Sequence, residues 1–434
     1  MPSPTEIKAI LDRIASGTHT ESDLTALRRH MLLDPARDVV QIGKYNVHIG
    51  HGQEIQIGDR IYQGPDAETL RAVLRQVLDE ARPRPGIPFQ APPLPPYFVP
   101  RPDVSDRLKA QLLTGNGHPA GVLVVSAIHG LGGIGKSTLA AALTRDLEVL
   151  ARFPDGILWA TLGQQPDVLS LLSGWIQALG DYQFRSTTVE AATSHLGTLL
   201  HDKAALLVVD DAWDPAHVRP FRAGGDRCRV LVTTREALIA QAVGASLYDL
   251  DVMTPDQALA LLEGRLGRDL TGEERATARE LARVVGYLPL ALELAAAQVA
   301  DGVPWDELIE DLNAEIARLE ALEPPGAEEV GDERERKRLS LIASFHLSLR
   351  RLPEDRRESF AWLGVLPEDV RLTPKMMATV WGKGERETRD RLRYLRNNSL
   401  LLPDKTPPYR LHDLLHDLAR RLLTAPPEPV REGD

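Results

Sequence analysis

A glycine-rich segment near position 130 has the residue types and the spacing of a phosphate-binding turn. The residues GLGGIGKST at 130–138 fit the pattern G-x-x-x-x-G-K-[ST]. Glycines let such a turn point successive backbone N–H groups at a phosphate, and the helix that follows adds the positive end of its dipole. The lysine reaches the outer phosphates, and the hydroxyl after it can bind Mg²⁺. We therefore expect phosphate binding by Gly130, Gly132, Gly133, Gly135, Lys136, Ser137 and Thr138, with Ser137 also a metal ligand.

Two carboxylates follow an apolar run farther along the chain. The run ALLVVD at 205–210 is typical of a buried strand, and Asp210 and Asp211 stand at its end. A carboxylate beside the phosphate turn can hold Mg²⁺, and a second one can orient or deprotonate an attacking water. We assign the first role to Asp210 and the second to Asp211, which together predict slow hydrolysis of a bound triphosphate.

Arg235 is a third candidate for the same site. It directly follows the run RVLVTT at 229–234, which also predicts a buried strand. A cation at the edge of the sheet that carries the phosphate turn can sense or neutralise a γ-phosphate. The alternative is a solvated surface arginine.

A parallel sheet must bring these residues together. Helical segments separate five apolar runs, which are VLVVSAI (122–128), GILWATL (156–162), ALLVVD (205–210), RVLVTT (229–234) and SLYDLDV (246–252). This alternation predicts a P-loop α/β domain. From Thr254 onward the spacing is mostly helical, a charged link covers 323–337, and 338–423 form a further compact unit.

Composition narrows the class of protein. The chain has 434 residues, of which 43% are hydrophobic and 26% charged, so a wholly disordered or fibrous chain is excluded. Its net charge of −11 gives no general attraction to nucleic acid or to an anionic membrane. The single cysteine, Cys228, excludes an intrachain disulfide. No apolar run approaches the roughly 20 residues of a membrane span, and no signal peptide is evident, so we expect a cytoplasmic protein without a membrane anchor.

The N-terminal part carries short tetrads between two helical patterns. The tetrads VQIG (40–43), VHIG (47–50) and IQIG (55–58) resemble the core of RHIM-type amyloid signalling motifs. In such motifs the strands of many chains stack in register, and their isoleucine side chains would interdigitate. The alternative is a small β-meander, which the flanking helical patterns favour. The proline-rich stretch at 82–102 predicts an extended, semi-rigid linker.

Two further motifs give the chain a specific family resemblance. GYLPLALELAA (286–296) resembles the GLPLA motif, and YRLHDLLHDLAR (409–420) resembles the MHD motif with Leu411 in place of methionine. Both belong to the NB-ARC family, the STAND-type switch NTPases of plant disease-resistance proteins, apoptosome proteins and bacterial relatives. The segments FVPRPD (98–103), FPDGILWATLG (153–163) and SFAWLGVLPED (359–369) extend the resemblance, which covers about residues 97–424.

The resemblance implies further site residues. Pro289 would line the adenine and ribose side of the pocket, and Val99 and Arg101 would lie near the adenine, although Pro100 stands where the family often has glycine. His412 would reach the β-phosphate of bound ADP and lock the domains shut. Taken singly, each motif also fits an ordinary helix turn or cap.

The resemblance also implies an organisation and a function. The expected parts are an N-terminal adaptor module at 1–81, the linker at 82–103, the P-loop domain at 104–252, a helical domain at 253–335, a winged-helix domain at 336–424 and a tail at 425–434. The expected function is an ATP/ADP-binding switch with Mg²⁺ in signal transduction. ADP holds it closed, exchange opens it, and self-association then clusters the N-terminal module for an unidentified effector, in bacterial defence or regulation.

Two other functions compete with the switch. The basic segment RETRDRLRYLRNN (386–398) is typical of a recognition helix, which predicts a nucleotide-gated DNA-binding regulator, but the net acidity of the chain opposes it. His412 and His416 are four residues apart, as in a zinc pair, but the sequence offers no nearby third ligand.

Overall fold

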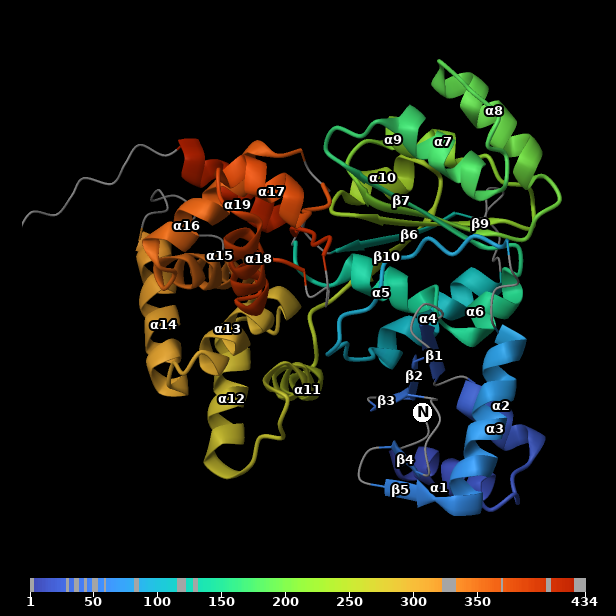
Figure 1. The fold of residues 1–434 in the computed structure, drawn as a ribbon, viewed down its shortest axis with the longest axis horizontal. Helices are drawn as coiled ribbons and strands as arrows, with labels where there is room; N and C mark the ends of the chain where they lie inside the picture. The colour runs from blue at the N-terminus through green and yellow to red at the C-terminus, as the bar shows by residue number, and fades with distance from the viewer. Residues whose placement is uncertain are drawn as a thin grey trace, which may run out of the picture. The chain divides into compact units, whose positions relative to one another are not determined.

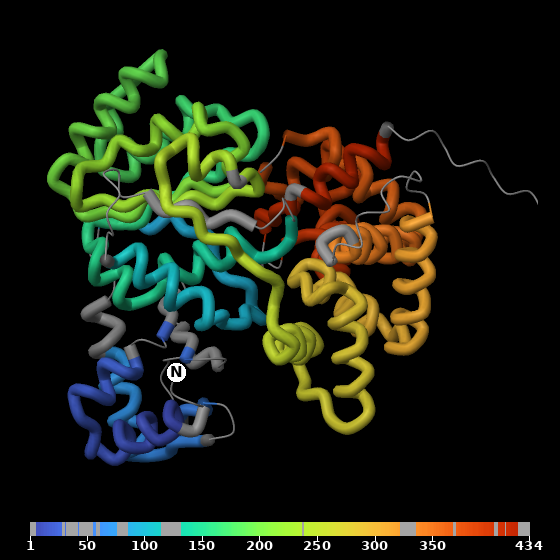
Figure 2. Tube along the Cα trace, turned by 180° about the vertical axis from the view of Figure 1, so that it is seen from behind, coloured from blue at the N-terminus to red at the C-terminus, as the bar shows by residue number. Residues whose placement is uncertain are grey.

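The chain forms two compact units (Figure 1, Figure 2). The first holds Met1–Leu94, Val99–Gly130 and Lys136–Leu250, and the second holds Pro95–Phe98, Leu131–Gly135 and Asp251–Asp434. The boundary between the units therefore lies within the glycine-rich segment. The glycine turn belongs to the second unit, and Lys136 belongs to the first. This computed structural model describes residues 4–28, 31–34, 39–42, 45–48, 54–57, 60–81, 86–114, 122–127, 132–321, 333–367, 370–402 and 407–424.

The N-terminal part of the first unit is a small α+β module. It consists of α1 (Pro4–Ala15), α2 (Glu21–Arg28), β1 (Met31–Asp34), β2 (Val39–Ile42), β3 (Tyr45–His48), β4 (Glu54–Ile57), β5 (Arg60–Gln63) and α3 (Gly64–Ala81). Strands β1, β2 and β3 form one antiparallel sheet, and β4 pairs with β5. Ile42, Ile55 and Ile57 of the tetrads are buried, so the described strands adopt the folded arrangement. The tetrad glycines lie outside the described residues.

The remaining part of the first unit contains a parallel sheet, as the apolar runs predict. Its strands are β6 (Val122–Ala127), β7 (Ile157–Gly163), β8 (Leu206–Ala212), β9 (Arg229–Thr234) and β10 (Ser246–Leu250), in the spatial order β10-β6-β9-β8-β7. Its helices are α4 (Pro102–Thr114), α5 (Lys136–Leu143), α6 (Leu147–Arg152), α7 (Val168–Ala178), α8 (Val189–Leu200), α9 (Pro215–Val218), the 3₁₀ turn η2 (Arg219–Arg222) and α10 (Ala237–Ala242). Helices cover both faces of the sheet (Figure 1), which is why β8 is buried along its whole length.

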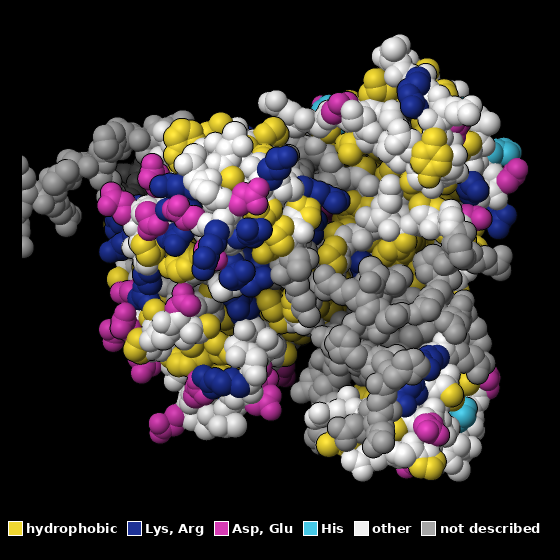
Figure 3. All heavy atoms as spheres, viewed as in Figure 1, with side chains coloured by type: hydrophobic (Ala, Val, Ile, Leu, Met, Phe, Trp, Pro, Cys, Tyr) yellow, Lys and Arg dark blue, Asp and Glu magenta, His cyan; other side chains and the backbone are white. Residues whose placement is uncertain are grey.

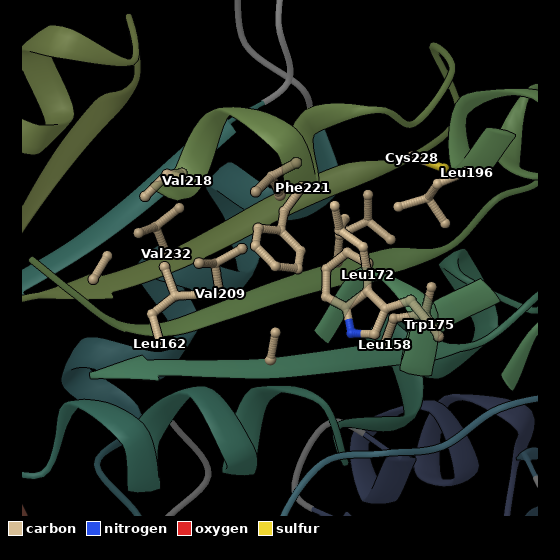
Figure 4. Packing of buried hydrophobic residues seen from close by; sticks show 14 of the residues in the cluster. Leu158, Leu162, Leu172, Trp175, Leu196, Val209, Val218, Phe221, Cys228 and Val232 are labelled. Carbon is tan, nitrogen blue, oxygen red and sulfur yellow. The ribbon is translucent and has the colours of Figure 1, made fainter. Parts of the chain in front are cut away.

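A dense apolar core fixes the sheet against α7, α8 and the turn η2 (Figure 4). Trp175 and Phe221 meet edge to face, with ring centroids 4.9 Å apart, and Val209 and Val232 pack from neighbouring strands. Cys228 is a free, buried thiol in the same core. This core holds the carboxyl ends of β8 and β9 in a fixed relation.

The described part of the proline-rich stretch is extended, as predicted, and it packs on the edge of the parallel sheet. Phe89 forms a parallel bridge with Ile157 of β7, and the N–H groups of Gln90 and Ile157 donate to Ile157 and Pro88 at 3.0 and 2.9 Å. Arg145 donates to the carbonyl of Ala91, and its guanidinium lies over the Phe89 ring. Residues 86–94 therefore cover the edge of the sheet, where proline is tolerated.

The second unit is helical. It consists of α11 (Pro255–Leu266), α12 (Gly272–Val284), α13 (Pro289–Ala300), α14 (Trp305–Ala321), α15 (Glu333–Arg350), α16 (Glu354–Ala361), the 3₁₀ turn η3 (Trp362–Val365), α17 (Pro374–Trp381), α18 (Glu385–Asn397) and α19 (Asp413–Thr424). Helix α13 lies at its centre and contacts α11, α14 and α15. Our expected boundary at 335/336 falls inside α15, which packs on α13 and α14. Leu372 and Tyr409 pair as a short antiparallel bridge, and the winged-helix assignment stays a prediction.

A polar cluster connects four segments of this unit. The Tyr97 hydroxyl donates to the Glu293 carboxylate at 3.2 Å, and the Arg265 guanidinium lies over the Tyr97 ring. Arg265 also donates to the carbonyl of Asn397 and to the Ser399 hydroxyl, which in turn donates to the carbonyl of Glu293 at 3.1 Å. Burial raises the pKa of Glu293 to about 7. None of the described helices is long and apolar enough to cross a membrane.

Candidate functional site

The glycine-rich turn has a backbone that requires glycine. Gly133 and Gly135 have φ angles of +73° and +94°, in the left-handed region that residues with a Cβ rarely adopt. Lys136 begins α5 and is buried, Ser137 is exposed, and Thr138 is half-buried. Gly130 lies outside the described residues. The described part thus has the strand–turn–helix context that phosphate binding needs.

The turn packs against the first residues of two distant helices. The N–H of Leu290, in the first turn of α13, donates to the carbonyl of Gly133 at 3.3 Å. A Cβ on Gly135 would lie 3.9 Å from Pro289 Cγ, and one on Gly132 would lie 2.5 Å from Leu414 Cδ1 in α19. The structure therefore brings the glycines together with the GLPLA-like and MHD-like segments, all within the second unit.

His412 caps the N-terminus of α19. Its Nδ1 accepts a hydrogen bond from the backbone N–H of Leu414 at 3.2 Å. An accepting Nδ1 carries no hydrogen, so the neutral ring has its hydrogen on Nε2. The cap therefore sets the tautomer in which Nε2–H is a donor, which is the form that a phosphate oxygen requires. The neighbouring Leu411 is half-buried.

His416 has a different environment. It is buried, and its Nε2 lies 2.9 Å from the carbonyl of Leu366, to which it donates. In the part of the chain that the structure describes, no three His, Cys, Asp or Glu side chains gather as a metal site. One of the two ring nitrogens of His416 is thus engaged by the backbone.

The two aspartates lie buried at the carboxyl end of β8 and share one threonine. The Thr233 hydroxyl, at the end of β9, donates to Asp210 Oδ1 and accepts the N–H of Asp211 at 2.9 Å. One hydroxyl therefore orients the carboxylate of Asp210 and the backbone of Asp211. The carboxylate of Asp210 and the hydroxyl of Ser137 are oxygen donors of the kind that Mg²⁺ prefers, so the residues present fit that ion.

Arg235 lies beside Asp211, not in bulk solvent. It is buried, and its Nε is 3.7 Å from Asp211 Oδ1. The indole N–H of Trp213 donates to Asp211 Oδ2 at 2.8 Å, and the guanidinium lies 5.1 Å from the centre of the Trp213 ring. The alternative of a solvated surface arginine is therefore wrong.

Thr233 and Trp213 were missing from the residues expected from sequence. Thr233 is one of two threonines that directly precede Arg235, and a hydroxyl at the end of a strand next to the aspartates is the signal that could have identified it. Trp213 stands two residues after Asp211, where an exposed side chain is equally compatible with the spacing.

Val99 and Arg101 precede α4 in the first unit. The carbonyl of Arg101 accepts the N–H groups of Val104 and Ser105 at 3.1 and 2.8 Å, so its backbone starts the helix. Arg101 is buried and Val99 half-buried. They belong to the unit of Lys136 and the aspartates, whereas Pro289 and His412 belong to the unit of the glycine turn.

The basic segment at 386–398 forms most of α18, and its charges are largely compensated. Arg391 is buried and pairs with Glu387 at 2.8 Å and Asp355 at 3.1 Å, so it holds α18 on α16. Arg393 pairs with Asp390 at 3.5 Å. On the face drawn in Figure 3, the Lys and Arg side chains over the second unit stand among Asp and Glu side chains.

Comparison with protein families agrees with this geometry. Residues 102–269 match the NB-ARC domain, and residues 1–77 match effector-associated domain 10. This chain contains an NB-ARC domain. The resemblance found in the sequence and the expected P-loop fold are thereby confirmed. The NB-ARC match includes the glycine turn, both aspartates and Arg235, whereas Pro289 and His412 lie beyond it.

Relatives of this chain include bacterial, animal and plant proteins. It is 32% identical over 364 residues to the regulatory protein AfsR of Streptomyces coelicolor, covering 82% of this chain and 34% of the relative. It is 28% identical over 348 residues to apoptotic protease-activating factor 1 of Danio rerio, covering 75% of this chain and 26% of the relative. The chain thus spans about a third of the first relative and about a quarter of the second.

A solved structure has the same fold. It is a Signal Transduction ATPase with Numerous Domains (STAND) protein with a tetratricopeptide repeat sensor from Pyrococcus horikoshii. The two are 16% identical with a TM-score of 0.50, and the match covers 80% of this chain and 45% of the other.

Proposed function

We propose that this chain is a cytoplasmic ATP/ADP switch in signal transduction, closed with ADP and open with ATP. The observation that carries the proposal is the packing of the glycine turn on Leu290 of α13 and Leu414 of α19. A phosphate held by that turn lies near the starts of both helices. One nucleotide can therefore be sensed by segments more than 100 residues apart in the chain, which is what a switch requires.

Each site residue has a proposed role. The backbone N–H groups of Gly130, Gly132, Gly133 and Gly135, with Lys136 and Thr138, hold the phosphates, and Ser137 and Asp210 hold Mg²⁺, which neutralises phosphate charge when bound. Asp211 orients the attacking water, and Arg235 contacts the γ-phosphate. Val99, Arg101 and Pro289 line the base, and His412 donates from Nε2 to the β-phosphate of ADP.

The size of the His412 contact limits what it does alone. A hydrogen bond to a charged group is worth about 1.5–3 kcal/mol. Moving a two-state equilibrium from 1:99 to 99:1 takes about 5.5 kcal/mol. His412 therefore supplies roughly half at most, and the packing of Leu290 and Leu414 on the turn supplies much of the remainder.

Hydrolysis and self-association complete the proposed cycle of the switch. We propose that slow hydrolysis resets it, and that the open form self-associates and gathers the N-terminal modules for an effector.

The proposed domains are the adaptor module at 1–81, the linker at 82–103, the P-loop domain at 104–252, the helical domain at 253–335, the winged-helix domain at 336–424 and the tail at 425–434. Bacterial defence or regulation is the proposed setting, since residues 1–77 match an effector-associated domain.

Light scattering after size-exclusion chromatography tests the switch. The chain is loaded with ADP and then exchanged into ATP with Mg²⁺, and the expected result is a monomer with ADP and a larger species with ATP. Lys136→Ala should show one size in both nucleotides. A wild-type chain whose mass ignores the nucleotide contradicts the proposal.

A nucleotide-gated DNA-binding regulator is the second candidate, which the similarity to the regulatory protein AfsR favours. Arg386, Arg389 and Arg393 are exposed on α18 and are the residues to test, whereas Arg391 is buried and holds the fold. Reversing the charges of Arg386 and Arg393 should abolish a salt-dependent shift of duplex DNA if this candidate holds. The compensated charges of α18 support the switch instead.

A further inference from the structure

Trp213, Asp211 and Arg235 form a closed triangle of side chains. The indole N–H donates to one oxygen of Asp211, the guanidinium lies by the other oxygen, and the same guanidinium lies over the indole ring. Each member contacts the other two. Such mutual contacts fix the direction of a carboxylate far better than one ion pair, because a single pair leaves the side chain free to rotate.

The indole N–H lies closer to the carboxylate than the guanidinium does, at a distance that orients it. It lies 2.8 Å from Asp211 Oδ2, within hydrogen-bond length, whereas Arg235 Nε lies 3.7 Å from Asp211 Oδ1. The backbone of Asp211 also needs support, since its φ of +50° is in the left-handed region and its N–H is held by Thr233 at 2.9 Å. Thr233 thus fixes the backbone of Asp211, and Trp213 fixes its side chain.

Trp213 is not an ordinary core residue. It is half-buried, and it does not belong to the apolar core that contains Trp175 and Phe221. A residue placed there only for packing would gain most by turning its ring into that core. Its polar edge instead faces the carboxylate, and its ring faces a cation, where the attraction to the π system is favourable.

We propose that Trp213 is a positioning residue for nucleotide hydrolysis, with its indole N–H orienting the carboxylate of Asp211 and its ring keeping Arg235 beside it. The proposal rests on the proposed function, in which Asp211 orients the attacking water. Trp213 itself does not touch the nucleotide in this account. It acts through Asp211 and Arg235. Removal of the indole N–H alone, with an aromatic ring kept for Arg235, therefore changes the rate of hydrolysis and not the affinity for nucleotide.

Single-turnover hydrolysis of radiolabelled ATP tests this role. Trp213→Phe keeps an aromatic ring for Arg235 and removes the N–H. The rate should fall about tenfold or more, while the Kd values for ADP and ATP stay within about twofold of the wild type. Trp159→Phe is the matched control, because the Trp159 indole N–H also donates to a side chain, Thr161, on β7 of the same sheet. Its rate should equal that of the wild type.

A double-mutant cycle separates positioning from a structural role. If Trp213 acts through Asp211, then Trp213→Phe causes no further loss in the Asp211→Asn background. The proposal is overturned if the two substitutions reduce the rate independently, so that their fold-changes multiply in the double variant. It is also overturned if Trp213→Phe lowers the nucleotide affinity and the Tm together with the rate. If the wild type binds nucleotide but shows no turnover, Trp213 has no reaction to support and this inference fails, while the switch stands. If the wild type binds no nucleotide, the proposed function itself fails.

Discussion

Gly132→Ala is expected to loosen the closed form without straining the backbone. The φ of Gly132 is not among the positive values, so alanine fits the backbone. Its added methyl group, however, would lie 2.5, 2.8 and 3.0 Å from Leu414 Cδ1, Cγ and Cδ2. Ordinary contacts begin near 3.5 Å, so Leu414 must move by about 1 Å. Because Cγ is involved as well as the two methyl groups, a rotation of the chain end alone does not relieve the clash.

The magnitude follows from the cost of overpacking. Inserting a methyl group into a packed contact costs about 1–3 kcal/mol. If this cost falls on the closed form alone, the ratio of closed to open chains drops by about 5- to 150-fold. The N–H of Leu414 is the group that His412 Nδ1 accepts, so displacement of Leu414 also disturbs the histidine. ADP release should therefore accelerate.

The assay is the dissociation rate of a fluorescent ADP analogue, measured by stopped flow. Gly132→Ala should release it at least fivefold faster than the wild type. Leu414→Ala alone loosens the closed form, because it removes packing on the turn, but it also removes the atoms that clash. In the Leu414→Ala background, Gly132→Ala should therefore cause no further acceleration of release. The prediction is contradicted if Gly132→Ala holds ADP as long as the wild type, or if it accelerates release as much in the Leu414→Ala background as in the wild type.

Two further predictions concern single polar groups. Thr233→Val removes the hydroxyl that accepts the buried N–H of Asp211 and that donates to Asp210, at a cost of about 1–3 kcal/mol. Calorimetry should show weaker ATP binding with Mg²⁺ but little change with EDTA. Thr233→Ser keeps the hydroxyl and should behave as the wild type. In the folded chain the pKa of Glu293 is raised from 4.5 to about 7. The contribution of this group to the free energy of unfolding is therefore fully present below pH 4.5 and is lost as the pH rises toward 7. Glu293→Gln should therefore raise the Tm at pH 8 and leave it nearly unchanged at pH 4.5, and an equal shift at both values would contradict the raised pKa.

The parallel sheet could be predicted from the sequence because its strands are buried on both faces. Each strand is then a continuous apolar run, and the runs at 205–210 and 229–234 coincide with β8 and β9 to within two residues. The extended conformation of the proline-rich stretch was also predicted correctly for its described part. Its pairing with β7 could not be predicted, because Phe89 and Ile157 are far apart in the chain and nothing local encodes their contact.

The site could be predicted only where its chemistry has a local pattern. The spacing of glycines around Lys136 needs no tertiary information, and neither does a carboxylate pair at the end of an apolar run. Thr233 and Trp213 were missed because their contacts with Asp210 and Asp211 depend on how β8 and β9 are placed side by side, and the register shifts between Val209 and Ala212. The tautomer of His412 depends likewise on a cap contact that only the structure shows.

The nucleotide that the purified chain carries is the most direct test of the central claim. Protein is denatured without added nucleotide, and the supernatant is analysed by mass spectrometry for the wild type, Lys136→Ala and His412→Ala. The account predicts nearly one ADP per wild-type chain, none for Lys136→Ala, and a reduced amount for His412→Ala. Wild-type protein without bound nucleotide that also fails to take up ADP or ATP would contradict it, as would ADP retained in full by Lys136→Ala.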